Sequence, residues 1–202
     1  MSQDDYKKIL GRFPKGHGYY IPLQIAFHTG ISSAEVCGLT WDCVDLRNGI
    51  IYVEKTLIYK DKKWTFSSPK TKSSYREIYL GDTLVRVLKE HKQMQRINKV
   101  KYGSDYITSE FVCTKENGQF ITKNDLNRLS RIVNKKLNID FTFHALRHTH
   151  ATMLLEADVP MKEIQERLGH SESSTTMDIY SHVTTNMKED SVLKLEMINS
   201  KL

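Results

Sequence analysis

The sequence predicts an α+β protein that is mainly helical, with one small antiparallel sheet of three or four strands inserted near the N-terminus. Between residues 50 and 80, β-branched and aromatic segments alternate with polar turns, which is typical of short strands. Elsewhere, apolar residues recur at the spacing of amphipathic helices. No linker rich in proline, glycine or serine divides the chain, so we expect one domain over residues 1–202.

The first predicted elements are two helices on either side of a Thr-Gly pair. Residues 19–28 are apolar on most faces and predict a buried helix, which the following Thr-Gly pair ends. Ser32 or Ser33 can cap a second, short helix that runs to Leu39. A serine hydroxyl suits this position because it accepts a hydrogen bond from an otherwise unpaired backbone N–H.

The next segments predict the sheet and two longer helices. Four short runs are rich in β-branched and aromatic residues, and two later runs carry apolar stripes. The strands are expected at Ile50–Val53, Thr56–Tyr59, Trp64–Phe66 and Arg76–Leu80, and the stripes run from Leu84 to Met94 and from Leu126 to Leu137. Thr122 and Thr142 stand where helix N-caps are expected.

Charge and composition limit the classes of function. Lys and Arg number 30 against 24 Asp and Glu, a formal charge of +6 that weakly favours a polyanion as partner. No apolar run approaches the roughly 18 residues that span a bilayer, and the polar N-terminus does not resemble a signal peptide. Cys37, Cys43 and Cys113 form no CxxC pair, so we expect neither disulfides nor a Cys-based zinc site, and a cytoplasmic location.

Two motifs bring together groups that suit a phosphodiester. His144 and Arg147 are three residues apart on a predicted helix and share a face, so both can point at one anion. An arginine fork matches two phosphate oxygens, and a histidine adds a donor whose charge changes near neutral pH. His170 follows Gly169, which stops a helix expected to begin at Pro160, so that it can reach into a site from a loop.

Tyr180 and Lys70 complete this set. A tyrosine hydroxyl, with an ordinary pKa of about 10, attacks a phosphate when cations stabilise the phosphorane and the phenolate. Lys70 lies in a predicted hairpin turn, where its flexible ammonium can protonate a leaving oxygen. Singly, each group has an ordinary structural explanation, such as a surface pair, a helix cap, a packed tyrosine or a solvated charge run. Their order and spacing together favour the catalytic interpretation.

The chain resembles the catalytic domain of the tyrosine recombinase (phage integrase) family. The motifs that carry the resemblance are His144-Ala-Leu-Arg147-His148-Thr149, Leu168-Gly169-His170 and Ile179-Tyr180-Ser181-His182, with upstream matches at Thr29-Gly30, Glu35, Leu39-Thr40-Trp41, Asp45 and Lys70-Thr71-Lys72. The match runs from about residue 20 to residue 190, which is nearly the whole chain.

The resemblance implies site-specific DNA recombination or integration, typical of a mobile element or prophage. Tyr180 would attack the scissile phosphate and form a 3′-phosphotyrosyl intermediate, which conserves the bond energy for rejoining. Arg147 and His144 would hold the non-bridging oxygens, with His170 as a further donor. Lys70 would protonate the departing 5′ hydroxyl. No cofactor and no metal is implied.

The resemblance also suggests supporting and DNA-binding residues. Glu35 and His148 are expected to support the site. Lys72, Ser73 and Arg76 could contact the DNA backbone beside the cleaved step, although a solvated hairpin explains them almost as well. A zinc site at the closely spaced histidines is not expected, since no cysteine or acid stands at ligand spacing.

One position departs from the family pattern. Family members carry a second phosphate-binding arginine in the pattern TGxRxxE, where this chain has Ser32. Loss of one positioned transition-state donor costs about 10²–10³ in rate. Natural decay, deliberate inactivation, or replacement by another cation from the hairpin of residues 60–72 would each explain the serine.

Partners and assembly follow from the same resemblance. It implies double-stranded DNA as partner, a monomer without DNA and a homotetramer in the synaptic complex. Residues 183–202 predict a weakly amphipathic helical tail that packs on its own domain or, by exchange, on a neighbouring subunit. Nothing in the chain could supply the N-terminal DNA core-binding domain of related integrases.

Three rival functions stay open at this point. The chain could be a catalytically silent DNA-binding module of the same fold, or a type IB topoisomerase-like enzyme that relaxes DNA. A helix-turn-helix regulator would leave Lys70, His170 and Tyr180 without a role.

Overall fold

The computed structural model describes residues 1–68 and 75–169. Its helices are α1 (Gln3–Arg12), α2 (Tyr20–Thr29), α3 (Ser33–Gly38), α4 (Asp82–Tyr102), α5 (Lys123–Leu137), α6 (Ala145–Glu156) and α7 (Met161–Leu168), with short 3-10 turns η1 (Trp41–Cys43) and η3 (Gly103–Asp105). The strands are β1 (Val44–Asp45), β2 (Ile50–Val53), β3 (Thr56–Lys60), β4 (Lys63–Ser67) and β5 (Arg76–Tyr79). The mainly helical α+β architecture is as predicted.

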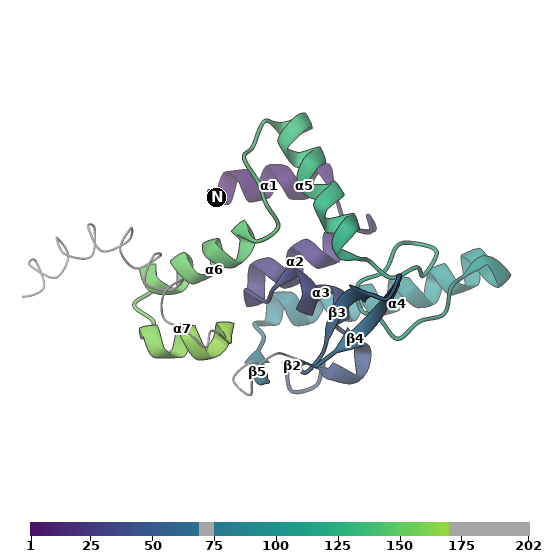
Figure 1. Ribbon diagram of the computed structural model, residues 1–202, viewed down its shortest axis with the longest axis horizontal. Coiled ribbons are helices and arrows are strands. Elements are labelled where there is room, and N and C mark those ends of the chain that lie inside the picture. Colours follow the sequence, from purple (N-terminus) through teal and green to yellow (C-terminus); the bar gives the residue numbers. More distant parts are fainter. Residues whose placement is uncertain (69–74, 170–202) are drawn as a thin grey trace, which may run out of the picture.

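Helix α2 runs through the middle of the fold (Figure 1). It is buried on most faces, because it packs against α3, α4 and α6. Gly30, in the left-handed conformation with φ 69°, ends the helix where the sequence predicted. The chain then enters α3 directly, with Ser32 as its N-cap. These two short turns bring α3 and the end of α2 close together.

The predicted strands exist, but they do not form one sheet. β2 pairs antiparallel with β5 and also with β1, a two-residue strand that the sequence did not predict. Strands β3 and β4 form a separate two-stranded hairpin. The hairpin leaves the sheet because β3 packs against α3 instead, where Gly38 permits close approach: a Cβ at Gly38 would lie 2.8 Å from the backbone nitrogen of Leu57.

Helix α1 was not predicted, although the sequence carries its signal. Ser2 and Asp5 form a capping box, in which each side chain accepts a hydrogen bond from the other residue's backbone N–H. Tyr6 and Ile9 then bury one face of the helix, which contacts α5. The acidic first turn hides this periodicity, since the polar residues dominate the composition of the segment.

The last described helices carry the caps that the sequence predicted, with one change. Thr122 caps α5 through a capping box with Asp125. The N-cap of α6 is His144, whereas Thr142 accepts a hydrogen bond from the N–H of Ala145 and so closes the preceding turn.

Helices α6 and α7 pack on each other through a small apolar cluster of their own, at the edge of the fold (Figure 1). Helix α7 also contacts β5, and α6 contacts α2. Within residues 1–68 and 75–169, no helix combines the length and apolar character needed to cross a membrane.

Candidate active site

Arg147 lies on α6 and joins the C-terminal ends of two other helices. Its Nη1 donates to the carbonyl oxygen of Gly30 at 2.9 Å, and its Nη2 donates to that of Leu168 at 2.7 Å. Gly30 caps α2, and Leu168 is the last residue of α7. Since Arg147 is only 8% exposed, the guanidinium is buried and is held from both sides of its planar fork.

Both helix ends owe their shape to a glycine in the left-handed conformation. Gly30 has φ 69° and Gly169 has φ 71°, which turns the chain away from the helix and leaves terminal carbonyls without partners inside it. The C-terminus of a helix carries partial negative charge and favours a cation. Burial lowers the pKa of Arg147 to about 10, so the side chain stays protonated at neutral pH. The two predicted helix stops therefore form the binding site of this arginine.

A buried ion pair lies close enough to Arg147 for both of its charges to act on the pKa of that residue. Arg76, at the start of β5, binds Glu35 of α3 through Nη1–Oε1 at 2.7 Å and Nη2–Oε2 at 3.3 Å. Burial alone would raise the pKa of Glu35, but hydrogen bonds from Arg76 and its charge outweigh burial and lower that pKa. Glu35 therefore stays ionised and bound at neutral pH.

The location of Arg76 differs from the one expected for a contact to the DNA backbone. Its side chain is 7% exposed, and its Nε donates to the backbone carbonyl of Arg167 at 2.7 Å. The guanidinium is drawn inside because it neutralises Glu35, which is itself 10% exposed. In this structure Arg76 connects α3 to the end of α7 rather than lying on an exposed hairpin.

Ser32, where the family pattern predicts an arginine, is part of a helix cap. Its Oγ accepts from the N–H of Glu35 at 3.4 Å, and Glu35 Oε2 accepts from the N–H of Ser32 at 2.6 Å. The serine thus supports α3 and holds the carboxylate that pairs with Arg76. It supplies a neutral hydroxyl where the family pattern supplies a charge.

His144 is the N-cap of α6, and Arg147 lies in the first turn of that helix. The Arg147 N–H donates to the His144 carbonyl at 3.0 Å, and the His144 side chain is exposed. The ring of His148 lies one turn further on, nearly perpendicular to that of His144 with 4.7 Å between centroids. Partial burial lowers the pKa of both rings, and neighbouring charges, including that of Arg147, lower it further, so both histidines are mostly neutral at pH 7.

The remaining predicted residues lie outside the described ranges. These are Lys70, Lys72, Ser73, His170 and Tyr180, and their roles stay predictions. The described chain ends at Gly169, directly before His170.

Two residues of this region were not predicted from the sequence. His150 and Arg167 are joined by a bond from Arg167 Nε to His150 Nε2 at 3.1 Å, close to both carbonyls that hold Arg147. Each stands beside a recognised motif, His150 just after the His-x-x-Arg motif and Arg167 just before the Leu-Gly-His motif. No local pattern links them, because the pair forms only when α6 and α7 pack together.

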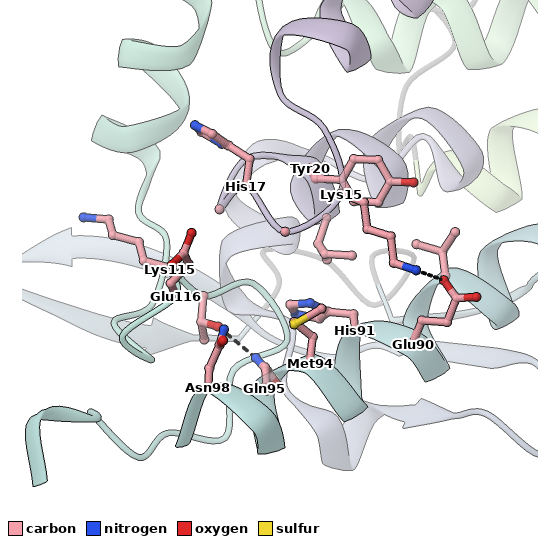
Figure 2. Close-up of a pocket in the computed structure, with 15 residues that line it drawn as sticks. Lys15, His17, Tyr20, Glu90, His91, Met94, Gln95, Asn98, Lys115 and Glu116 are labelled. Atoms are coloured by element: carbon pink, nitrogen blue, oxygen red, sulfur yellow. Dashed lines mark hydrogen bonds and ion pairs between the residues drawn. The ribbon is translucent and has the colours of Figure 1, made fainter. Parts of the chain in front are cut away.

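A separate hollow lies at the other end of α2 (Figure 2). Tyr20 on α2 and His91 on α4 line it, and Lys15 pairs with Glu90 at its edge, with 2.8 Å between Nζ and Oε2. Its cavity volume is about 30 Å³, which is enough space for an ordered water molecule. Because α2 is ten residues long, this hollow is about 15 Å from Gly30 and is not part of the arginine site.

The Glu35–Arg76 pair predicts a pH-dependent contribution to stability. Glu35→Gln should lower the free energy of unfolding at pH 7 by about 3 kcal/mol, because Arg76 stays buried without its carboxylate. The lowered pKa of Glu35 means that its contribution is present above the ordinary value of 4.5 and is lost as pH falls through the folded value. Urea unfolding of both proteins from pH 7 to pH 3 should therefore show the difference shrinking below pH 4.5.

The matched control is Glu90→Gln, which removes the carboxylate of the exposed Lys15–Glu90 pair. This change should leave stability almost unaltered, since exposed pairs contribute little. A Glu35→Gln difference that stays constant down to pH 3 would contradict the assignment.

Comparison with known proteins agrees with the fold and with the family resemblance. The phage integrase family model matches residues 1–187. The chain is 34% identical to a tyrosine recombinase XerC-like protein of Caldanaerobacter subterraneus subsp. tengcongensis, with 95% of this chain and 52% of that protein aligned. It is 31% identical to the integrase of Staphylococcus phage L54a, with 84% and 49% aligned. The chain thus spans about half the length of these relatives.

Solved structures share the fold at lower identity. The Tn1549 transposon integrase in complex with circular intermediate DNA superposes with a TM-score of 0.78 at 24% identity, over 96% of this chain and 66% of that one. The XerA recombinase gives 0.69 at 22% identity, over 95% and 62%. The predicted fold of a tyrosine recombinase catalytic domain is confirmed, and the chain belongs to the phage integrase family.

Proposed function

We propose that this chain cleaves and rejoins double-stranded DNA as the catalytic part of a site-specific recombinase or integrase of a mobile element or prophage. The observation that carries the proposal is the buried Arg147, held by two helix ends beside a cluster of further arginines. Family membership supports it, since relatives of this chain are named integrases and tyrosine recombinases.

The charge of the cluster suits a phosphate. The described part of the cluster comprises Arg76, Arg147 and Arg167; Glu35 pairs with Arg76, and its charge also acts on Arg147. An arginine fork matches two oxygens of a phosphate, and Arg147 is the member of the cluster that we assign to the DNA phosphate. Positioned cations of this kind stabilise the charge that develops on a phosphorane.

In the proposed reaction, Tyr180 attacks the scissile phosphorus. The bond from its phenolic oxygen to phosphorus forms while the bond from phosphorus to the 5′ oxygen breaks. The tyrosine gives up its proton to solvent water, and the 5′ oxygen receives one from Lys70. Arg147, His144 and His170 bind the non-bridging oxygens, and attack by a 5′ hydroxyl on the phosphotyrosine reverses the steps. No cofactor or metal takes part.

Ser32 bears on how fast this reaction runs. A capping hydroxyl cannot contribute the transition-state charge of an arginine, and one such donor is worth about 10²–10³ in rate. The serine therefore supports a second candidate function, a catalytically silent DNA-binding module of the same fold. Cleavage assays separate the two candidates, whereas binding assays do not.

A basic surface on α5 supports DNA as the partner. Arg128, Arg131 and Lys135 are exposed at three- and four-residue spacing, which places them along one face of the helix. With Lys136 they line a shallow groove of about 280 Å³. Side chains of this kind bind phosphates without reading bases.

The same proposal includes assembly and location. The active form is a homotetramer on two DNA sites, formed from monomers, with residues 183–202 exchanged between subunits. The reaction takes place in the cytoplasm, which agrees with three cysteines that are all buried and free.

Covalent trapping tests the reaction. A pool of nicked duplexes with randomised sequence around the nick lets the protein select its site, and a protein–DNA band that survives denaturation reports the phosphotyrosine. Tyr180→Phe should abolish the band.

Ser32→Arg should raise the rate at which the band forms by about 100-fold, because it restores a positioned cation. Loss of the Ser32 cap should cost about 1 kcal/mol of stability.

Ser33→Arg is the matched control, since it adds the same charge one residue away without occupying the family position. It should leave the trapping rate unchanged. Equal trapping by the unaltered protein and by Ser32→Arg would refute the proposal that a cation at position 32 accelerates cleavage. Tight DNA binding with no covalent product from either protein would favour the silent module.

Salt dependence of binding tests the α5 surface. Arg128→Gln with Arg131→Gln should weaken binding to any duplex and reduce the slope of log affinity against log salt by about 2, one for each lost phosphate contact. Arg86→Gln with Lys89→Gln, two exposed residues of α4 at the same spacing, is the control and should leave the slope unchanged. Equal slopes for both double variants would exclude α5 from the interface.

A further inference from the structure

Arg167 connects four parts of the fold that surround Arg147. Its Nε donates to the ring of His150 on α6 at 3.1 Å. Its Nη2 donates to the carbonyl of His28 on α2 at 3.4 Å and to that of Tyr79 on β5 at 3.3 Å. The residue therefore ties the last turn of α7 to the end of α2, to α6 and to the sheet.

His150 completes this connection from the other side. Its Nδ1 lies 3.0 Å from the carbonyl of Phe27, so it must carry the proton and donate, and Nε2 must be the acceptor for Arg167. Burial, and then the charge of Arg167, lowers the pKa of His150 to about 4, which keeps the ring neutral in this form at ordinary pH. The ring is thus a fixed bridge between α2 and Arg167.

The carbonyl groups at the C-terminal end of α2 are hydrogen-bonded by side chains of α6 and α7. Terminal carbonyls of a helix have no partners within it. Here the carbonyl of Phe27 binds His150, that of His28 binds Arg167, and that of Gly30 binds Arg147. Three hydrogen bonds from side chains of α6 and α7 therefore hold the C-terminal end of α2 in place.

Packing beneath these contacts leaves little room for adjustment. A Cβ at Gly30 would lie 2.6 Å from Leu168 Cδ2 and 2.7 Å from His150 Cδ2. The second carbonyl that holds Arg147 belongs to Leu168, the residue directly after Arg167. A shift of Arg167 would therefore move one of the two hydrogen-bond acceptors of Arg147 relative to the other.

We propose that Arg167 and His150 are positioning residues for the cleavage reaction, which lock the ends of α2 and α7 in register and so aim the Arg147 guanidinium. The proposal rests on the function proposed above. It assigns neither residue a contact with DNA. A displacement of about 1 Å at a reacting group can cost about 100-fold in rate, so the lock matters for chemistry more than for binding.

Two pairs of variants distinguish the hydrogen bonds of Arg167 from those of His150. Arg167→Met removes all of its hydrogen bonds while keeping an unbranched side chain, and Arg167→Lys keeps the charge without the fork. His150→Asn retains a donor for the Phe27 carbonyl but is too short to place an acceptor at the position of Nε2, whereas His150→Gln places an amide oxygen there. Lys162→Met, an exposed change on the same helix, is the control.

The first measurement does not depend on activity. In NMR spectra of the full chain labelled with ¹⁵N at arginine, the two Nη groups of Arg147 should give separate, exchange-protected signals, identified by their loss in Arg147→Lys. Arg167→Met and His150→Asn should merge or abolish these signals. His150→Gln and Lys162→Met should preserve them. Unchanged Arg147 signals in Arg167→Met would overturn the proposal.

The second measurement is single-turnover cleavage at saturating DNA, in the unaltered chain or in Ser32→Arg, whichever traps more DNA. Arg167→Met and His150→Asn should each slow cleavage by about 10- to 100-fold, with DNA affinity and its salt slope unchanged. The double variant should be no slower than Arg167→Met alone, because both changes break one link. His150→Gln should restore most of the rate.

Two outcomes would overturn the claim that Arg167 and His150 act together to position Arg147. A loss of affinity with a salt slope lower by about 1 in Arg167→Met would make Arg167 a phosphate ligand. Additive effects of the two changes would make them independent. Absence of cleavage in every background would instead refute the proposed function, and the NMR result would still decide whether Arg167 and His150 hold Arg147.

Discussion

The fold around this site depends on one buried guanidinium that bridges the C-terminal ends of two helices. Arg147 reaches the carbonyls of Gly30 and Leu168, which are 138 positions apart in the sequence and belong to the ends of α2 and α7. Both acceptors are available because left-handed glycines end their helices. The burial of α2, the pairing of α6 with α7 and the contact of α7 with β5 all serve to bring these two ends together.

The charges near this bridge each serve more than one element. Glu35 completes the cap of α3 with Ser32 and also neutralises Arg76, whose Nε in turn binds the backbone at Arg167. One carboxylate therefore supports a helix start, a strand start and a helix end. Ser32 keeps the structural part of this arrangement while lacking the charge that the family pattern supplies.

Much of the local structure could be predicted because its signals lie within a few residues of each other. The glycine stops, the caps at Ser32 and Thr122, and the shared turn of His144 with Arg147 are all short-range features. Helix α1 was missed although its capping box was readable, because the acidic first turn concealed the apolar face. Sequence motifs likewise identify the family, because each motif is short.

Long-range pairing could not be predicted in the same way. The separation of the β3–β4 hairpin from the main sheet depends on how closely β3 approaches Gly38. The burial of Arg76 depends on a partner 41 positions away, and the His150–Arg167 bridge on the packing of two helices. A single sequence shows the residues of such pairs but not which of them come into contact in the fold.

A structure of the chain bound to a duplex that it selects from a randomised pool tests the central claim most directly. If Arg147 is the anchored ligand of the scissile phosphate, non-bridging oxygens of one backbone phosphate will lie about 3 Å from its guanidinium, with the ring of His144 in reach of the same phosphate. DNA bound along α5 with no phosphate near Arg147 would contradict it.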